Sequence, residues 1–211
     1  MKKIRVLLAD DHRMFLAGLQ RLLEPDFEVV GAVEDGRALL AAADRLQPDV
    51  IVADISMPLL NGIDALRQLQ AGGSNAKFLF LTMHGDSLFL REALRLGASG
   101  YVLKRDAPDQ LIAAIRRVAR GKSYVAPDLI RGAVLESPGQ DSLPTLDRLT
   151  PRQREVLQLV AEGKSLKEIA AAIHISVKTV EFHKYNLMQQ LGARSNAELT
   201  TIALRHGLVS V

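Results

Sequence analysis

The stretch Val50-Ile51-Val52-Ala53-Asp54-Ile55-Ser56-Met57-Pro58 decides the fold that we expect for this chain. It opens with a continuous apolar run, and Pro48 and Pro58 bound it, which is typical of a buried strand in a parallel sheet. Ligands of open α/β sheets bind beyond the carboxyl ends of such strands. Since Asp54 is the carboxylate that this strand delivers, we expect the chemistry of the domain to converge on Asp54.

The first part of the chain alternates apolar runs with segments of helical period. This alternation predicts an α/β fold, a five-stranded doubly wound parallel sheet with helices on both faces. The expected strands are residues 4–9, 28–33, 49–53, 78–82 and 100–103, and the expected helices are residues 13–23, 37–46, 63–70, 87–96 and 108–120.

The pattern changes after residue 122. Residues 123–146 are rich in Pro, Gly and Ser and predict a linker, so that residues 1–122 form one domain and residues 147–211 a smaller one. In the second domain, Ser and Thr start signals precede four compact apolar segments, which predicts an all-α fold. The short connection at residues 172–176 predicts a helix-turn-helix, with residues 176–191 as the recognition-type helix.

Composition limits the compartment and the class of protein. The 211-residue chain has no cysteine, which excludes a disulfide framework and a thiolate metal site. No apolar run approaches the ~20 residues of a membrane helix, and the start lacks the apolar region of a signal peptide. We therefore expect a cytoplasmic protein without a membrane segment.

The excess positive charge lies entirely in the second domain. Residues 1–146 hold 18 Lys and Arg against 18 Asp and Glu, whereas residues 147–211 hold 9 against 6, which accounts for the net charge of +3. A short basic domain beside a neutral one favours a polyanion as the partner of the second domain.

Three carboxylates are expected at one edge of the predicted sheet. Asp10 and Asp11 end the first strand, and Asp54 ends the third, and parallel strands end at the same edge. Mutual repulsion would raise their pKa values unless a cation neutralises them, and such oxygen ligands suit Mg²⁺. Two adjacent aspartates after a strand are also compatible with a simple solvated turn.

Two further strand ends distinguish these readings. Thr82 closes the fourth strand and Lys104 follows the fifth, so a hydroxyl and an ammonium group are expected beside the carboxylates. An aspartate that attacks phosphorus needs a cation to shield its charge, and the transferred oxygens need fixed donors. The combination predicts a phosphoryl site.

Four motifs in this order resemble the receiver domain of two-component response regulators. They are Leu7-Leu-Ala-Asp-Asp11, Asp54-Ile-Ser-Met-Pro58, Leu81-Thr-Met-His84 and Gly97-Ala-Ser-Gly-Tyr-Val-Leu-Lys104. The second domain, from Leu149-Thr-Pro-Arg-Gln-Arg-Glu-Val-Leu157 to Thr179-Val-Glu-Phe-His183, resembles the LuxR-type helix-turn-helix of the NarL/FixJ arrangement. The resemblance implies a transcription factor, not an enzyme.

The resemblance implies roles for residues of the first domain. Asp54 would accept a phosphoryl group from a sensor histidine kinase, and Mg²⁺ would lie among Asp10, Asp11, Asp54 and the Ser56 carbonyl. Lys104 would pair with the phosphoryl oxygens, Thr82 would swing to hydrogen-bond them, and Tyr101 would turn inward. From the residues alone, Tyr101 is equally well explained as ordinary core.

Residues of the second domain are expected to contact double-stranded DNA. A helical wheel of residues 176–191 leaves a stripe of exposed side chains, which suits contact with base edges and also a protein interface. The resemblance implies base contacts from Glu181, Phe182 and Tyr185 and phosphate contacts from Lys164, Lys167, Lys178, Thr179 and Arg194.

The resemblance also implies a homodimer on activation, bound to an inverted-repeat site. We expect complementary charge on the switch face of the receiver, which is formed by the expected helices 87–96 and 108–120 and the strand 100–103. The basic residues there are Arg116, Arg117 and Arg120, and the acidic ones are Asp86 and Glu92.

The sequence departs from the family in a few places and leaves two alternatives. Arg105 stands where a proline often follows the family's lysine, and some relatives carry lysines in place of Glu181 and Tyr185. One alternative is a DNA-binding regulator that does not use phosphorylation. The other is an aspartyl-phosphate phosphatase of the haloacid dehalogenase type, which would carry a second Asp where this chain has Ser56.

Overall fold

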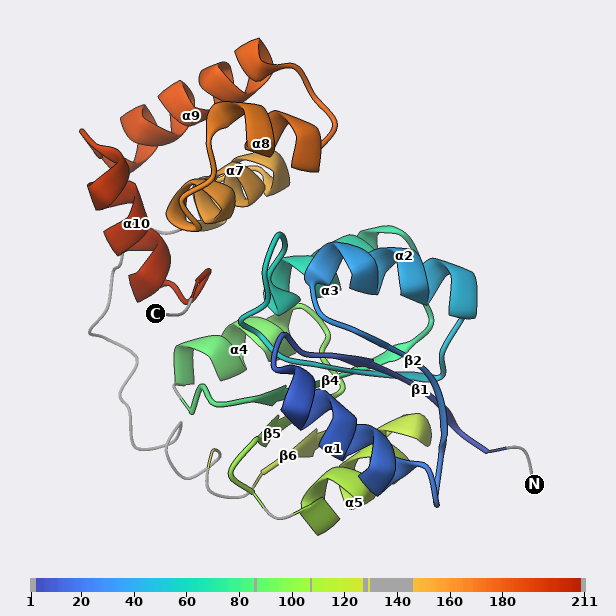
Figure 1. Ribbon diagram of the computed structural model, residues 1–211. Helices are drawn as coiled ribbons and strands as arrows, with labels where there is room; N and C mark the ends of the chain where they lie inside the picture. The colour runs from blue at the N-terminus through green and yellow to red at the C-terminus, as the bar shows by residue number, and fades with distance from the viewer. Residues whose placement is uncertain (1–2, 86, 107, 127–128, 130–145, 210–211) are drawn as a thin grey trace. The chain divides into compact units, whose positions relative to one another are not determined.

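The computed structural model describes residues 3–85, 87–106, 108–126, 129 and 146–209 (Figure 1). The described residues form two compact units. Every described strand lies in the first unit, and the second unit is helical. The predicted α/β domain with a smaller all-α domain is therefore confirmed.

The first unit alternates strands with helices. Its elements are β1 (Arg5–Ala9), α1 (Arg13–Leu23), β2 (Glu28–Val33), α2 (Gly36–Leu46), β3 (Val50–Ala53), α3 (Gly62–Ala71), β4 (Lys77–Thr82), α4 (Ser87–Arg95), β5 (Gly100–Leu103), α5 (Pro108–Ala119) and β6 (Tyr124–Val125). The strands are parallel in the order β2-β1-β3-β4-β5-β6.

The prediction of five strands was wrong by one. Tyr124 and Val125 pair with Gly100 and Tyr101 at the edge of the sheet, although the sequence analysis assigned both to the linker. Two residues are too few to show the alternation that identifies a strand. Most of the predicted linker, 123–146, lies outside the described residues, and the domain boundaries remain predictions.

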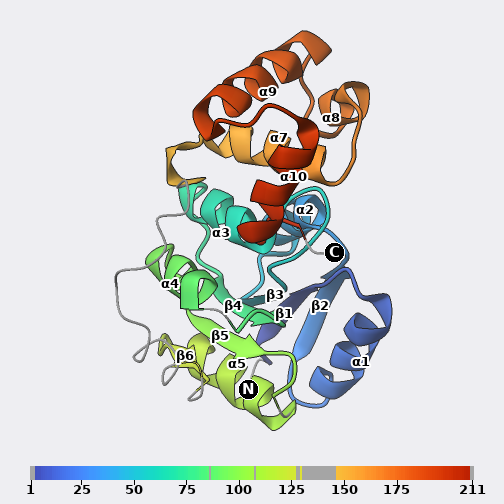
Figure 2. The ribbon, with the colours of Figure 1, turned by 90° about the vertical axis from the view of Figure 1, so that its left-hand side faces the viewer.

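Helices cover both faces of the sheet. The apolar sides of α1 and α5 pack on one face, where Leu16, Leu23, Ile115 and Val118 form a cluster with apolar residues of the five longer strands. Figures 1 and 2 show α2 and α3 on the opposite face. Central strands buried in this way need no polar alternation, which explains the continuous apolar run 50–53.

The strand register fixes the position of the candidate site. Ala9 of β1 pairs with Ala53 of β3, so the next residues, Asp10 and Asp54, leave the sheet side by side. Thr82 of β4 pairs with Leu103 of β5, so Lys104 emerges at the same edge. Four residues far apart in the sequence are thus brought to one end of the sheet.

The second unit consists of short capped helices. They are a 3-10 turn η1 (Leu146–Arg148), α7 (Pro151–Ala161), α8 (Leu166–Ala172), α9 (Val177–Leu191) and α10 (Asn196–Arg205). Apolar residues of all four α-helices form its core, among them Leu157, Ile169, Val180 and Leu199. Between α8 and α9, His174 has a φ of 53°, which turns the chain sharply into α9. The predicted helix-turn-helix is confirmed.

The Ser and Thr residues that signal helix starts in the sequence do cap the helices, but the box at Ser195 is not closed. Thr150 and Ser165 form complete capping boxes with Gln153 and Glu168. Ser195 accepts a hydrogen bond from the Glu198 amide, but the Glu198 carboxylate accepts from the amide of Arg194 instead of closing the box.

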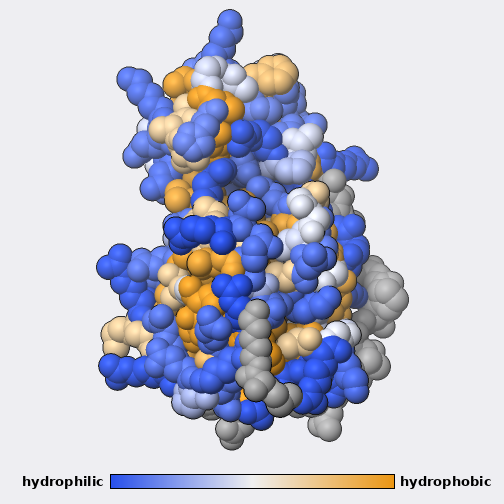
Figure 3. Space-filling view, turned by 90° about the vertical axis from the view of Figure 1, so that its right-hand side faces the viewer, coloured by the Kyte–Doolittle hydropathy of each residue, from blue (hydrophilic) through white to orange (hydrophobic). Residues whose placement is uncertain are grey.

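Hydrophilic residues are spread over the face shown in Figure 3, and apolar residues reach the surface in patches between them. Within the described part of the chain, no helix is both long enough and apolar enough to cross a bilayer.

Candidate functional site

The carboxylates of Asp10, Asp11 and Asp54 converge at the carboxyl end of β1 and β3. Asp10 and Asp54 are only 2% and 5% exposed, whereas Asp11 is half-buried. One potential ligand atom from each of these residues and from His12 lies within 4.8 Å of the others. The structure thus brings together the acids that the sequence analysis placed at this edge.

Lys104 lies between two of the carboxylates. Its Nζ is 2.7 Å from Asp10 Oδ2 and 2.5 Å from Asp54 Oδ2, and it lies 4.8 Å from the centre of the Phe15 ring. Burial alone would lower the pKa of Lys104, but the negative charges of Asp54 and Asp10 outweigh burial and raise it. The raised pKa keeps the Lys104 side chain in its charged ammonium form.

Asp10 shows the opposite balance. Burial raises the pKa of its carboxyl group, and the hydrogen bonds from Lys104 and the His12 amide offset this only in part. A single ammonium group shared by two buried carboxylates does not neutralise both. The pocket therefore carries excess negative charge, which a divalent cation would balance.

The donor atoms in this pocket fit a divalent cation. Asp11 Oδ1 is buried and accepts no hydrogen bond, although His12 Nδ1 is 2.9 Å away. His12 Nδ1 is also 3.2 Å from Asp10 Oδ1. The three carboxylates each offer an oxygen within 4.8 Å of the others, and Mg²⁺ prefers carboxylate oxygens as ligands.

The second side of the pocket is formed by the ends of β4 and β5. Thr82 is fully buried, and its hydroxyl accepts a hydrogen bond from the His84 amide at 3.3 Å. The Ser56 hydroxyl is 2.8 Å from His84 Nε2. Tyr101 is fully buried and donates its hydroxyl proton to the His84 carbonyl at 2.7 Å. His84 thus joins the loop of Asp54 to the predicted switch residue Tyr101.

Sequence reasoning missed the contacts of His12, Phe15 and His84. His12 and His84 were expected to border the site, and His84 to restrict the access of water, but residue types that fit many surroundings did not predict the contacts themselves. His12 follows directly after Asp11, and His84 follows two residues after Thr82, so proximity to the site was the only signal in the chain.

The loop that carries Asp54 is held by a close backbone approach. The Ile55 amide donates to Asp54 Oδ1 at 2.6 Å, and the Gly62 amide donates to the Ile55 carbonyl at 2.7 Å. A Cβ atom on Gly62 would lie 2.1 Å from the Asp54 carbonyl oxygen. Only glycine allows α3 to begin so near the loop.

The predicted DNA-contacting residues of α9 lie on its outer side. Phe182 and Tyr185 are 62% and 63% exposed, and Lys178 and Glu181 are exposed as well. Val180 and Leu187 are fully buried on the other side of the helix. Two large aromatic rings exposed together on one side of a helix are typical of an interaction surface.

The other predicted DNA contacts surround α9. Lys164 and Lys167 lie exposed near the start of α8, and Arg194 is exposed just after α9. Thr179 is only half-buried, and its hydroxyl lies 2.8 Å from that of Ser176, the N-cap of α9. These cations thus lie near the start of α8 and beyond the carboxyl end of α9, and two hydroxyl groups lie at the amino end of α9.

Two family profiles match this chain. Residues 6–116 match the response regulator receiver domain, and residues 147–203 match the luxR family of bacterial regulatory proteins.

Curated relatives are similar over nearly their whole length. The chain is 39% identical over 198 residues to the transcriptional regulatory protein UhpA of Escherichia coli, covering 93% of this chain and 95% of UhpA. It is 38% identical over 215 residues to the oxygen regulatory protein NreC of Staphylococcus carnosus, covering 98% and 99%. A solved structure of two RcsB dimers bound to two parallel DNAs is 30% identical with a TM-score of 0.61, covering 95% of this chain and 98% of that one.

Proposed function

The chain belongs to the response regulators that join a receiver domain to a LuxR-type DNA-binding domain, and we propose that phosphorylation of Asp54 switches its binding to DNA. The observation that carries this proposal is the buried cluster of Asp10, Asp54 and Lys104 at one end of the sheet. A sensor histidine kinase would supply the phosphoryl group. The relatives are transcriptional regulators and not enzymes, which removes the support for a phosphatase.

Mg²⁺ is the cofactor that this pocket would hold. Asp10, Asp11, Asp54 and the Ser56 carbonyl would be its protein ligands, and the unsatisfied Asp11 Oδ1 supports this assignment. When bound, the ion would balance the carboxylates and withdraw charge from the phosphoryl oxygens. Magnesium would keep several water molecules as its remaining ligands.

Transfer of the phosphoryl group requires one bond to form and one to break. An Asp54 carboxylate oxygen attacks the phosphorus atom of a phosphohistidine, the phosphorus–nitrogen bond breaks, and the histidine nitrogen keeps the electron pair and takes up a proton. Lys104, which pairs with Asp54 Oδ2 before transfer, would then pair with a phosphoryl oxygen.

Thr82 and Tyr101 would transmit the change. Among the described residues, the Thr82 hydroxyl accepts one long hydrogen bond of 3.3 Å from the His84 amide, so it can turn toward a phosphoryl oxygen at little cost. Tyr101 is already inside the fold, bound to the His84 carbonyl. A shift of the loop that carries Thr82 and His84 would therefore reach Tyr101 directly.

The second domain would read DNA through α9. Glu181, Phe182 and Tyr185 would contact base edges in the major groove. Phosphate contacts would come from five residues near the ends of α8 and α9, which are Lys164, Lys167, Lys178, Thr179 and Arg194. Exposure of the two aromatic rings supports this assignment over an ordinary solvated face.

We infer that the active form is a homodimer on an inverted-repeat site, and the RcsB dimers on DNA support this. The charge complementarity expected from the sequence is a weaker support. The Glu92 carboxylate already forms ion pairs with Arg67 at 2.7 Å and with Arg95 at 2.9 Å. Arg116 already forms an ion pair with Asp26 at 2.6 Å. Asp86 lies outside the described residues. Domain limits of 1–122 and 147–211 complete the proposal.

Phosphorylation is tested with acetyl phosphate and Mg²⁺, followed by the intact mass of the protein. We expect one phosphoryl group on the unmodified sequence and none on Asp54→Asn. Omission of Mg²⁺ should strongly reduce the adduct. A regulator that does not use phosphorylation would gain no adduct under any of these conditions.

A further inference from the structure

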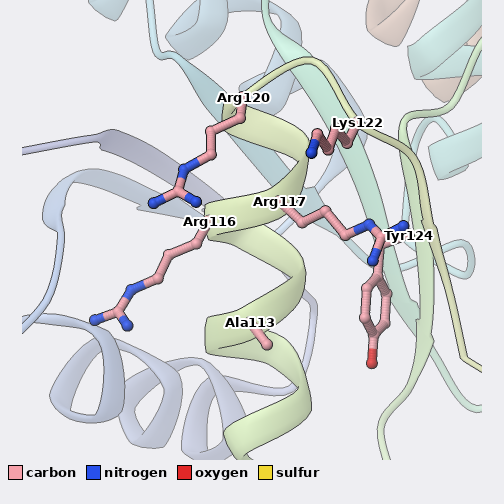
Figure 4. Close-up of a pocket in the computed structure, with 6 residues that line it drawn as sticks. All are labelled: Ala113, Arg116, Arg117, Arg120, Lys122 and Tyr124. Atoms are coloured by element: carbon pink, nitrogen blue, oxygen red, sulfur yellow. The ribbon is translucent and has the colours of Figure 1, made fainter.

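A cavity of about 520 Å³ lies at the end of α5, away from the phosphoacceptor site. Its lining comes from the last turns of α5, the following turn and β6, and comprises Ala113, Arg116, Arg117, Arg120, Lys122 and Tyr124 (Figure 4). A volume of this size is within the range of pockets that hold small molecules.

The lining is strongly basic. Four of its six residues are cations, and no acidic residue lies between positions 113 and 124. The surrounding part of the chain is neutral, since residues 1–146 hold 18 basic and 18 acidic residues. The four charges are therefore a local concentration and do not reflect a basic domain.

Internal partners leave much of this charge unbalanced. Arg116 binds Asp26 at 2.6 Å, and Arg117 Nε donates to the Ser123 carbonyl at 2.9 Å, which leaves its terminal nitrogens available. Arg120 and Lys122 have no side-chain partner among the residues that the structure describes. Arg116 and Arg120 are four residues apart, a spacing at which like charges repel.

A cation near a helix end is common because it interacts with the carbonyl end of the helix dipole. The helices α1 and α2 each have one such residue in the last turn, Arg21 and Arg45. The end of α5 gathers four cations, more than this role requires. The excess is best explained by a polyanion that binds between them.

We propose that this pocket binds a small molecule that carries several phosphate groups in series. Figure 4 shows Arg116 and Arg120 on one side of α5 and Arg117 and Lys122 on the other, so an elongated anion is needed to reach both sides. Arginine binds phosphate oxygens through two parallel N–H groups, and lysine adds a point charge. Tyr124 offers a ring and a hydroxyl at the border, where a nucleoside could stack.

The test uses the full chain and isothermal titration calorimetry with sodium tripolyphosphate at low salt. The double variant Arg120→Gln/Lys122→Gln should bind about tenfold more weakly. The matched control Arg21→Gln/Arg45→Gln removes the same charge from two other helix ends and should bind as tightly as the unmodified chain. Thermal melting of both variants checks that the fold is kept.

Two results would overturn the proposal. One is an equal loss of affinity in the control, which would mean that only the net charge matters. The other is loss of binding in Lys178→Gln with no loss in Arg120→Gln/Lys122→Gln, which would locate the anion on α9. ATP, titrated in parallel, identifies the source of the phosphates: tighter binding than tripolyphosphate assigns a nucleotide, and equal binding assigns an inorganic polyphosphate.

Discussion

Gly62→Ala should destabilise the receiver domain and disturb the phosphoacceptor loop together. The added Cβ would lie 2.1 Å from the backbone oxygen of Asp54 and 3.0 Å from the Phe80 ring. Overpacking typically costs about 1–3 kcal/mol, and a backbone oxygen cannot turn aside as a flexible side chain can. We therefore expect a loss at the upper end, about 3 kcal/mol. Since Asp54 belongs to the same loop, its phosphorylation by acetyl phosphate should slow as well.

The assay is urea unfolding followed by circular dichroism. With a slope of about 2 kcal/mol per molar urea, the midpoint should fall by about 1.5 M. The matched control is Gly18→Ala on the exposed side of α1, where a Cβ would have no neighbour within 4 Å. That variant should gain about 0.5–1 kcal/mol, because alanine favours a helix. An unchanged midpoint for Gly62→Ala would refute the proposed close approach to Asp54.

Three further outcomes are expected. Without Mg²⁺, Asp10→Asn should raise the melting temperature at neutral pH, because it removes a buried negative charge. Burial raises the pKa of Asp10, so the unmodified protein gains stability as the pH falls through that pKa and the carboxyl group becomes neutral. The advantage of the variant should therefore disappear in acid. A constant advantage at all pH values would contradict this. Tyr185→Ala should cost about 1–3 kcal/mol on the specific duplex only, whereas Lys178→Ala should weaken all duplexes and lower the salt slope by about 1; equal losses on specific and scrambled duplexes for Tyr185→Ala would refute base reading. His84→Ala removes the contact with Ser56 and should shorten the lifetime of the phosphoryl group, which phosphate release measures.

The sequence predicted those parts of the fold that a repeating pattern determines. The buried run 50–53 and the strand ends Asp10, Thr82 and Lys104 were enough to infer that acid, hydroxyl and amine groups meet at one edge. This inference follows from parallel pairing, which brings the carboxyl ends of neighbouring strands to the same edge of the sheet.

The missed features depend on contacts between distant residues. The sixth strand is two residues long and exists only because Gly100 and Tyr101 present a free edge. The bond from Tyr101 to the His84 carbonyl depends on the path of a loop, which residue types do not fix. The basic pocket likewise needs β6 to lie beside the end of α5.

The central claim is that a phosphoryl group on Asp54 controls binding to DNA, and one comparison tests it directly. The affinity for a duplex selected by the unmodified protein is measured by fluorescence anisotropy, with Mg²⁺ present and with or without acetyl phosphate. We predict that acetyl phosphate tightens binding by the unmodified chain and has no effect on Asp54→Asn. Equal affinity of the unmodified chain in both conditions, with the phosphoryl adduct verified by mass, would contradict the claim.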